Sequence, residues 1–400
     1  MTTSHAAVRR PVILTFNRNY LPGYRGGGPI RTIANMVEQL GDRFEFRVVT
    51  QDRDAGSDEP YQGIEPDTWM PLGKGFVRYL NPAAISIATL AALIGNEPHD
   101  VLYLNSFFDR TFSTRILAAR GLGIVRTGPA VLAPRGEFSA GALRYKSLRK
   151  RLYLHGFRML GCDRGLIWQA STPLERADVR RVLPGITPDR IMVACDLASA
   201  HHAVEDPESA PVAGPLRILF LSRISPMKNL GFVLHVLARV RFPVALSIVG
   251  PRDADYWEEC QPALRSLPPN VTVEIHDSIP PPQVPDMMRR HDLLFLPTQG
   301  ENFGHVIHEA LSVGLPVLIS DRTPWNGVTA AGAGWALPLS APEPFVDVLT
   351  RHAAMDATGR TATRRAALHF ARAHAIDASA YDDNARLFTD TIAAHGGGHT

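Results

Sequence analysis

The feature that most constrains the fold is a repeated alternation of short apolar runs with longer helix-like segments. In the first half of the chain each run holds four or five residues, and turn-forming residues or a segment with helical spacing separate it from the next. Such runs are typical of buried strands in a parallel sheet that helices cover on both faces. The predicted strands are Val12 to Phe16, Phe46 to Thr50, Val101 to Leu104, Ala130 to Ala133 and Leu166 to Ala170.

A second series of the same kind follows a stretch rich in Ala, Pro, Glu, Asp and Gly, which we interpret as a linker. A chain of 400 residues is also too long for one ordinary hydrophobic core. We therefore predict an α/β protein with two Rossmann-like, doubly wound parallel-sheet domains and a cleft between them. The second set of predicted strands is Arg217 to Leu221, Ala245 to Val249, Val271 to Ile275, Leu293 to Leu296 and Val317 to Ser320. The predicted division is residues 1–204 for the first domain, 205–215 for the linker and 216–376 for the second domain. Residues 377–395 are predicted to form a C-terminal helix. This helix could pack across either domain, and packing back on the first domain is one of the two alternatives.

The net charge and the cysteine content limit which partners and which cellular location we expect. The net charge of +3 is too small to argue for nucleic acid, and none is predicted. The three cysteines lie far apart with no CxxC spacing, which favours reduced thiols, a cytoplasmic location and no metal framework. No run approaches the roughly 20 apolar residues of a membrane-spanning helix, so any membrane contact is expected to be peripheral.

The most informative segment runs from Glu301 to Leu311 and follows a predicted strand and a turn. A helix that begins near Gly304 would direct its first backbone N–H groups to the carboxyl edge of the sheet, where a phosphate group binds well. Glu301 precedes this helix and Glu309 lies within it, so both carboxylates can border one pocket and accept bonds from vicinal hydroxyls. From the residues alone, a surface capping Glu and a solvated helical Glu are an equally good interpretation.

This segment resembles the E-x7-E motif of retaining glycosyltransferases of family 4, which have the two-domain GT-B architecture. The neighbouring Glu-x-Phe-Gly sequence and the later Gly314-Leu315-Pro316-Val317 fit the same family. The resemblance implies that Glu301 binds hydroxyls of the donor sugar and that Glu309 binds the ribose of the nucleotide. It also implies that the backbone at Phe303, Gly304 and His305 faces the diphosphate and the sugar.

A basic loop follows the first strand of the second series. Arg223 and Lys228 supply a planar fork and a point charge to an anion at the end of that strand, although basic loop residues are more often simply solvated. The loop is similar to the family's G/S-R-x4-K loop, which implies that this pair grips the donor pyrophosphate and stabilises the leaving group. Negative charge grows on that group as the anomeric bond breaks, and fixed cations lower the barrier.

A glycine-rich loop follows the first strand of the chain. Its three consecutive glycines allow close approach of a ligand, and Pro29 suits the start of a helix that runs to about Leu40. A flexible linker is the alternative interpretation. The resemblance implies that Gly27 and Gly28 face the donor phosphates and that the acceptor lies nearby, and we assign Arg31 to acceptor binding.

The segment after the fourth predicted strand begins with Pro134-Arg135-Gly136-Glu137 and continues into a helix rich in Lys and Arg. Many family members carry a His near the Arg135 position, and this chain departs from that pattern. We assign Arg135 and Glu137 to acceptor binding. The basic stretch 143–153 is predicted either to be a solvated face or to lie on anionic lipid headgroups or a lipid-diphosphate acceptor.

No metal site is predicted. No HxxxH or HExxH spacing is convincing, and the two Asp-x-Asp sequences, Asp52 to Asp54 and Asp253 to Asp255, are interpreted as solvated turns. Trp325 is expected either to line the cleft or to pack in the core.

The resemblance therefore implies a metal-independent enzyme without a cofactor. It would transfer a hexosyl-type sugar, with retention, from a nucleotide sugar to a saccharide or lipid-linked acceptor in polysaccharide or glycoconjugate biosynthesis. A UDP-sugar is preferred as donor and a GDP-sugar remains open. The alternatives are a nucleotide-sugar epimerase or a phosphorylase on the same fold, and a non-catalytic nucleotide-sugar-binding protein of an assembly complex.

Overall fold

The computed structural model describes residues 9–144, 147–199, 214–375 and 378–396. The chain forms two compact units. The first unit extends to Leu197 and also includes the segment from Ala378 onward, and the second unit comprises the residues between them. Of the predicted linker 205–215, residues 205–213 lie outside the described residues.

The first unit contains an eight-stranded sheet with the order β3-β4-β2-β1-β5-β6-β7-β8. All neighbouring strands are parallel except β3 and β4, which pair as an antiparallel hairpin. The strands are β1 Val12–Phe16, β2 Glu45–Gln51, β3 Trp69–Leu72, β4 Gly75–Leu80, β5 Val101–Asn105, β6 Ala130–Ala133, β7 Leu166–Ala170 and β8 Ile191–Val193. The helices are α1 Gly28–Leu40, α2 Ile87–Asn96, α3 Ser113–Gly121, α4 Ala140–Arg144, α5 Ser147–Met159, α6 Pro173–Val182 and α13 Ala378–Gly396.

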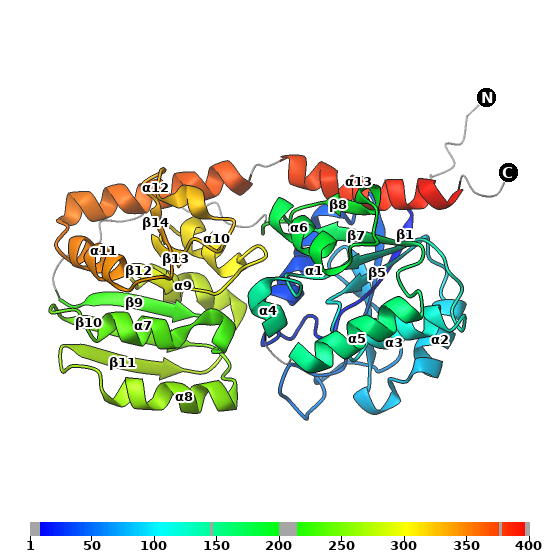
Figure 1. Ribbon diagram of the computed structural model, residues 1–400, viewed down its shortest axis with the longest axis horizontal. Coiled ribbons are helices and arrows are strands. Elements are labelled where there is room, and N and C mark those ends of the chain that lie inside the picture. The colour runs from blue at the N-terminus through cyan, green and yellow to red at the C-terminus, as the bar shows by residue number, and fades with distance from the viewer. Residues whose placement is uncertain (1–8, 145–146, 200–213, 376–377, 397–400) are drawn as a thin grey trace. The chain divides into compact units, whose positions relative to one another are not determined.

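Two apolar cores lie on the two faces of this sheet (Figure 1). One core joins the strands to α1 and α13, and its aromatic centre is Phe388, whose ring packs edge-on against Phe44, Phe46 and Tyr103. The other core joins them to α2, α3, α5 and α6. Strands buried on both faces explain why the sequence shows continuous apolar runs here rather than alternation.

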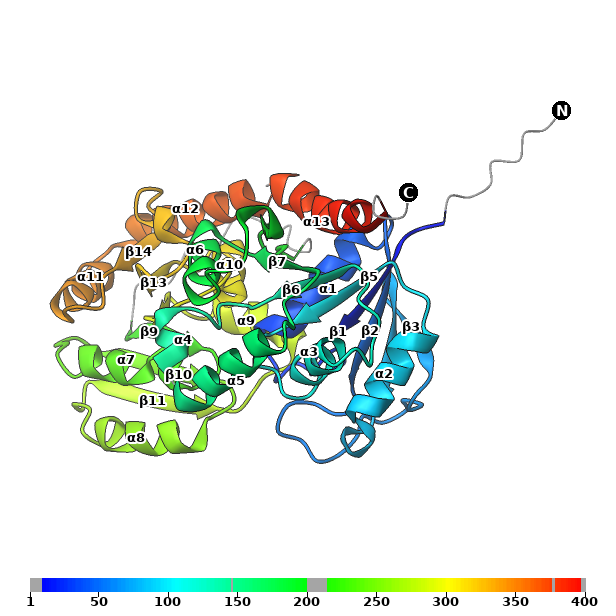
Figure 2. The same cartoon turned by 45° about the vertical axis from the view of Figure 1, so that its right-hand side comes forward.

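The second unit contains a six-stranded, entirely parallel sheet with the order β11-β10-β9-β12-β13-β14. The strands are β9 Leu216–Leu221, β10 Val244–Val249, β11 Val271–His276, β12 Leu293–Leu296, β13 Val317–Ser320 and β14 Gly334–Leu337. The helices are α7 Leu230–Leu237, α8 Ala254–Arg265, α9 Val284–Arg289, α10 His305–Ser312, α11 Glu343–Ala353 and α12 Ala357–Ala375. Helix α7 contacts α8 and α11, whereas α10 contacts α9 and α12 (Figure 2).

The prediction of two parallel-sheet α/β units is confirmed, and all ten predicted strands are present within one residue of their expected ends. Four further strands, β3, β4, β8 and β14, were not predicted. None of the helices in the described part of the chain is both long enough and apolar enough to cross a membrane.

Candidate functional site

The strand order of the second unit reverses direction between two central strands, β9 and β12. From β9 the chain moves outward to β10 and β11, and it then returns to place β12 on the other side of β9. The loops after β9 and β12 therefore leave the sheet in opposite directions, and open α/β sheets bind ligands at this kind of switch point. The predicted residues Arg223 and Lys228 follow β9, and Glu301 follows β12.

Lys228 and Glu301 form an ion pair, although they lie 73 positions apart in the sequence. The ammonium group donates a hydrogen bond to Oε1 of Glu301. Both side chains keep some access to solvent, with exposed fractions of 21% and 10%. A cation and a carboxylate thus meet at the ends of these two strands, and such a pair offers the charge and the hydroxyl acceptors that a diphosphate and a sugar would need.

Hydrogen bonds join the two loops below this pair. The backbone oxygen of Met227 accepts bonds from the Thr298 hydroxyl (3.0 Å) and from the Gln299 N–H (2.7 Å). The Asn229 side-chain amide donates to the backbone oxygen of Pro297 at 3.0 Å. These bonds join the loop after β9 to the loop after β12 and hold Lys228 beside Glu301.

Helix α10 begins where the sequence predicted it. Gly304 is its N-cap and has a left-handed backbone (φ 82°), a conformation that glycine adopts without steric cost. Trp325 fixes the entry to the helix, because its indole N–H donates to the backbone oxygen of Phe303 and its ring packs edge-on against the Phe303 ring at 5.3 Å. Trp325 is only 4% exposed, so it packs in the core, which is one of the two positions expected for it.

The remaining predicted residues of the second unit lie in the loop after β9, just before α10 and within α10. Arg223 is exposed, two residues after β9, and Glu309 is half-buried in the second turn of α10. Phe303 and His305 are buried and their rings pack together with centroids 4.7 Å apart. The first amide groups of any helix lack partners within the helix, so the start of α10 offers backbone donors and a positive dipole end. The ligand contacts assigned to these residues stay predictions.

The glycine-rich loop of the first unit follows β1, which is also a switch-point strand, with β2 on one side and β5 on the other. Gly27 is the N-cap of α1 with φ 71°, and α1 starts at Gly28, so the positive φ explains the glycine at 27. Arg31 lies one turn into α1, and burial lowers the pKa of its guanidinium to about 10. The loop is held by Asp54, whose carboxylate accepts the backbone N–H groups of Tyr24 and Arg25 at 3.0 and 3.2 Å.

This contact corrects the interpretation of the Asp-x-Asp sequences as solvated turns. Asp52 is buried and paired with Arg53, and Asp54 organises the glycine-rich loop. Asp253 is the N-cap of α8 and accepts the N–H of Tyr256 at 3.2 Å. No group of three or more His, Cys, Asp and Glu side chains in the described ranges could hold a metal ion.

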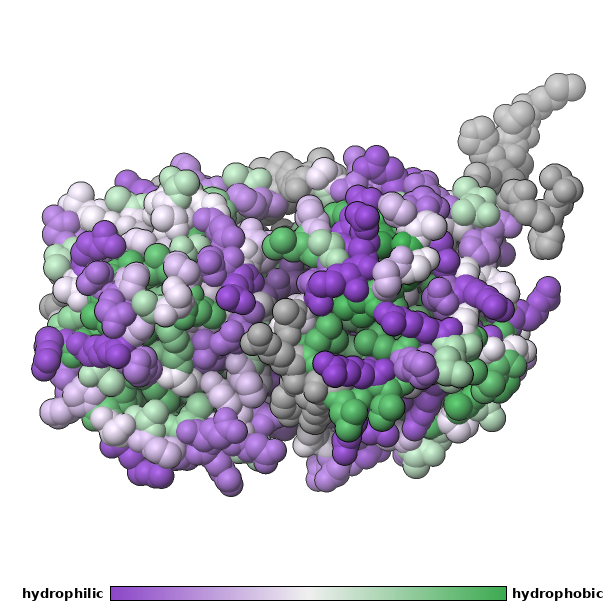
Figure 3. Space-filling view, in the orientation of Figure 1, coloured by the Kyte–Doolittle hydropathy of each residue, from purple (hydrophilic) through white to green (hydrophobic). Residues whose placement is uncertain are grey.

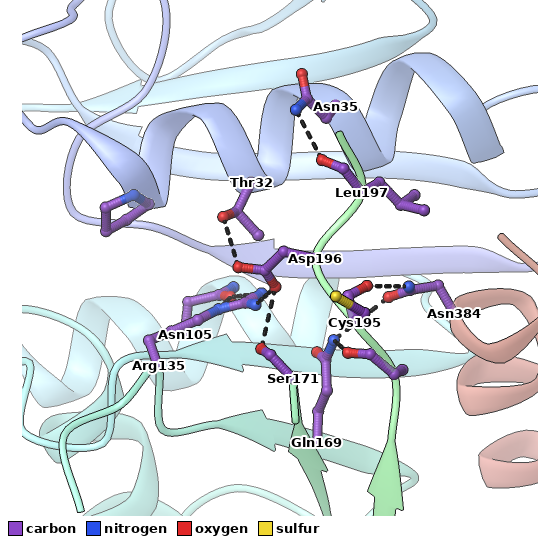
Figure 4. A network of polar contacts seen from close by, with 12 residues as sticks. Thr32, Asn35, Asn105, Arg135, Gln169, Ser171, Cys195, Asp196, Leu197 and Asn384 are labelled. Carbon is purple, nitrogen blue, oxygen red and sulfur yellow. Dashed lines mark hydrogen bonds and ion pairs between the residues drawn. The ribbon is translucent and has the colours of Figure 1, made fainter. Parts of the chain in front are cut away.

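Arg135 lies in a buried polar network rather than on the surface (Figure 4). Its guanidinium pairs with Asp196 and donates to Oδ1 of Asn105 and to the hydroxyl of Tyr103. Asp196 also accepts bonds from the hydroxyls of Thr32 in α1 (3.1 Å) and Ser171 after β7 (3.2 Å). Burial alone would lower the pKa of the guanidinium, but the charges of Asp196, Tyr103 and Glu175 and the hydrogen bond to Asp196 together outweigh it, so the pKa is raised. The predicted acceptor contact of Arg135 stays a prediction, and the structure gives this side chain a positioning role.

Glu137 lies two residues further on and is half-buried. Its carboxylate accepts bonds from the Ser106 hydroxyl and from the Phe108 N–H, the latter at 2.8 Å, and so ties the loop after β6 to the loop after β5. Burial raises the pKa of this carboxyl to about 7. Its assignment to acceptor binding likewise stays a prediction.

Sequence reasoning missed the residues that hold the two loops of the first unit. Asp54 belongs to an Asp-x-Asp sequence that we interpreted as a solvated turn. Asp196 stands in no sequence motif that would indicate a function. Glu175 was also missed, although it accepts the backbone N–H groups of Gly136 and Ser171. These acidic residues give no local signal, since Asp54 lies 30 positions from Tyr24, Asp196 lies 61 positions from Arg135 and Glu175 lies 39 positions from Gly136.

Comparisons with known proteins bear on the fold and on residues 204–355. Residues 204–355 match the family model described as glycosyl transferases group 1. Comparison with curated protein sequences gives no match.

Several solved structures resemble the whole chain. WaaG, a glycosyltransferase involved in lipopolysaccharide biosynthesis, is 16% identical with a TM-score of 0.65, and the match covers 96% of this chain and 100% of WaaG. Sucrose-phosphate synthase from Thermosynechococcus elongatus is 15% identical with a TM-score of 0.69 and the same coverage of 96% and 100%. Alr3699/HepE from Anabaena, in complex with UDP-glucose, is 16% identical with a TM-score of 0.65, covering 96% and 99%. The chain thus has the GT-B fold of these glycosyltransferases, and its residues 204–355 are similar to the group 1 glycosyl transferases.

Proposed function

We propose that the chain is a retaining, metal-independent glycosyltransferase that needs no cofactor. It takes a hexosyl-type sugar from a nucleotide sugar and transfers it to a saccharide or lipid-linked saccharide in polysaccharide or glycoconjugate biosynthesis. The observation that carries the proposal is the Lys228–Glu301 pair at the switch point of the second unit, next to the start of α10. The match of residues 204–355 to the group 1 family supports it, as does the UDP-glucose bound by the HepE structure.

In this proposal the nucleotide sugar lies across the ends of β9 and β12. Glu309 binds the ribose hydroxyls and Glu301 binds hydroxyls of the donor sugar. The backbone of residues 303–305 and the positive end of α10 face the diphosphate, with Gly27 and Gly28 as further donor contacts. UDP is the preferred nucleotide and GDP the second candidate.

Catalysis in this proposal is electrostatic. As the anomeric bond breaks, its electron pair leaves with the nucleoside diphosphate, and Arg223 and Lys228 stabilise the growing negative charge. The acceptor oxygen attacks the anomeric carbon from the face that the diphosphate leaves, and the departing phosphate takes the acceptor proton. Retention then needs no separate general base. Arg31, Arg135 and Glu137 stay our candidates for the acceptor side.

We further propose a cytoplasmic location with a peripheral contact to the inner face of an anionic membrane through residues 143–153. Lys150 lies on the inner side of this stretch, where its ammonium donates to the backbone oxygen of Ala142 at 2.6 Å. Other basic side chains of the stretch, including Arg149 and Arg151, are exposed and available to lipid phosphates.

The test is nucleotide release from a panel of UDP-, GDP-, ADP- and TDP-sugars, with and without saccharide acceptors, in the presence of EDTA. We expect release from one nucleotide class, stimulated by an acceptor and unaffected by EDTA. Arg223→Ala should depress turnover at least about 100-fold. Sugar interconversion without release would indicate an epimerase, binding without turnover would indicate a non-catalytic protein, and loss of release in EDTA would refute metal independence.

A further inference from the structure

Six large apolar side chains lie exposed in one region of the first unit. We call them the apolar patch: Leu122, Ile124, Leu148, Leu152, Met159 and Leu160. Their exposed fractions range from 47% to 74%. Scattered exposed apolar residues are normal, but a group of this size marks an interaction surface.

Helix α5 presents the centre of the patch. Leu148, Leu152 and Met159 lie at positions i, i+4 and i+11, which fall on one face of a helix. The opposite face is anchored, since Phe157 is buried and Tyr153 packs against the same core. The Phe157 ring contacts Phe107 at 4.9 Å. The outward stripe is therefore a fixed feature of the helix and not a result of loose packing.

The patch continues from α5 to the end of α3. Helices α3 and α5 are in contact. A Cβ atom placed on Gly121 would lie 3.5 Å from the Cβ of Leu160, so the two chain segments touch at this point. Leu122 and Ile124 follow Gly121 directly and extend the apolar surface. Figure 3 shows hydrophobic surface over α5 that strongly hydrophilic side chains cross.

The same region carries a concentrated positive charge. Between Ser113 and Leu160 the sequence holds ten Lys and Arg residues and one acidic residue, Glu137. Glu137 is bound inside the unit by Ser106 and Phe108, so its carboxyl does not offset the surface charge. Exposed arginines, among them Arg126, Arg149 and Arg151, flank the apolar patch. Of these ten residues Arg120 and Arg135 have buried side chains, and Arg135 is paired with Asp196, so the positive charge of the described surface comes from the exposed Arg126, Arg149, Arg151 and Arg158.

An anionic bilayer fits both chemistries better than nucleic acid or a second copy of the chain does. Nucleic acid would account for the arginines but would leave the leucines in water. A second copy of the chain bound through the same surface would set arginine against arginine. An anionic phospholipid bilayer offers apolar chains to the leucines and phosphates to the arginines, as interfacial helices with a basic flank require.

We propose that the apolar patch and its flanking arginines form a docking surface for an anionic phospholipid membrane, with α5 lying in the plane of the headgroups. The proposal rests in part on the proposed function, because a membrane-docked enzyme would reach a lipid-linked acceptor from the first unit. It extends the predicted contact at 143–153 to the end of α3 and to Leu160.

The test is co-sedimentation of the full chain with vesicles of phosphatidylcholine alone and of phosphatidylcholine with phosphatidylglycerol. We expect binding to the anionic vesicles only, weakened by salt. Leu148→Gln/Leu152→Gln should lower the partition coefficient at least about tenfold through lost apolar insertion. Arg149→Gln/Arg151→Gln should lower it about 10- to 30-fold through lost attraction to the headgroups.

Matched variants away from the surface serve as controls. Leu174→Gln removes a leucine of α6 that is 75% exposed, and Arg241→Gln/Arg265→Gln removes two exposed arginines of the second unit. Both should bind vesicles like the wild type. Equal binding to neutral vesicles, no binding to anionic ones, or unchanged binding by either patch variant would overturn the proposal. Nucleotide release without vesicles is scored separately, so a failure of docking and a failure of the proposed function give different results.

Discussion

At position 135 the chain holds an arginine in a left-handed backbone conformation, with φ 58°. Non-glycine residues rarely adopt this region, and they do so where surrounding contacts fix them. Here the contacts are the guanidinium bonds to Asp196, Asn105 and Tyr103. Through Asp196 the same network reaches Thr32 in α1, the helix that follows the glycine-rich loop.

Replacing Arg135 by lysine tests this positioning role. A lysine keeps the charge but lacks the planar fork that serves three acceptors, so buried oxygens lose their partners. We expect about 2 kcal/mol of lost stability and a melting temperature lower by about 5 °C, measured by thermal unfolding. An unchanged melting temperature with a raised KM for the acceptor would instead support the acceptor contact predicted from the sequence.

Glu137 predicts a pH dependence of stability. Burial raises the pKa of its carboxyl from the ordinary 4.5 to about 7 in the folded chain. The folded state therefore holds this proton more tightly than the unfolded state, and the contribution of Glu137 to stability falls as the pH rises from about 4.5 to about 7. Glu137→Gln removes this dependence.

The stability difference between Glu137→Gln and wild type should therefore shift by about 3 kcal/mol, in favour of the variant, between pH 4.5 and pH 8. Urea unfolding at several pH values measures it. Glu343→Gln, at an exposed position of α11, should follow the wild-type profile. Parallel profiles for Glu137→Gln and wild type would contradict the raised pKa.

Much of the second unit's site could be predicted from the residues, and much of the first unit's could not. Lys228 and Glu301 belong to loops with a recognisable local pattern, and the structure joins them in one ion pair. Asp196 stands in no pattern, and its partner Arg135 lies 61 positions away. Local sequence shows which loops face a ligand, but long-range partners depend on the fold.

At the scale of elements, the strands missed from the sequence are β3, β4, β8 and β14, and three of them, β3, β8 and β14, lie at sheet edges. Most of the predicted strands are apolar runs because helices cover both faces of the sheet. Strand β3 contains Pro71 and lies at the edge of the sheet, where a missing N–H costs little. Strand β8 is three residues long, and β14 begins with Gly334. Edge strands this short or irregular carry too little apolar pattern to be recognised.

Helix α10 allows a test of the site at the level of one element. In Gly304→Ala the new alanine would have to keep the left-handed backbone conformation of Gly304. Its Cβ would lie 3.1 Å from Cδ1 of Ile307 and 3.3 Å from Nε1 of Trp325. We expect about 1–2 kcal/mol of lost stability and weaker nucleotide binding, since the first turn of α10 must shift. Gly300→Ala is the control, because its Cβ would meet no atom within 4 Å. Equal UDP affinity in both variants would show that the start of α10 does not contribute to nucleotide binding.

At the scale of the whole molecule, the last helix follows the second unit in the sequence but is part of the first unit. Helix α13 belongs to the first unit, where the Asn384 side chain donates to the backbone oxygen of Cys195 and accepts from Gln169 (Figure 4). Its amphipathic sequence predicts a helix but not a partner, because either sheet could have covered the same apolar stripe. The contacts of Phe388 with Phe44, Phe46 and Tyr103 exist only in the folded chain.

The central claim is that the second unit binds a nucleoside diphosphate at the Lys228–Glu301 pair. Calorimetric titration of UDP, and then GDP, into the full chain tests it most directly. Lys228→Ala removes a charge-assisted bond and leaves the Glu301 carboxylate facing the diphosphate, so affinity should fall about 10- to 100-fold. The control Lys74→Ala, at an exposed lysine paired with Asp42 in the first unit, should bind like the wild type. We predict binding of one of the two nucleotides with this loss in Lys228→Ala alone. Binding of neither nucleotide, or equal affinity in Lys228→Ala and wild type, would contradict the account.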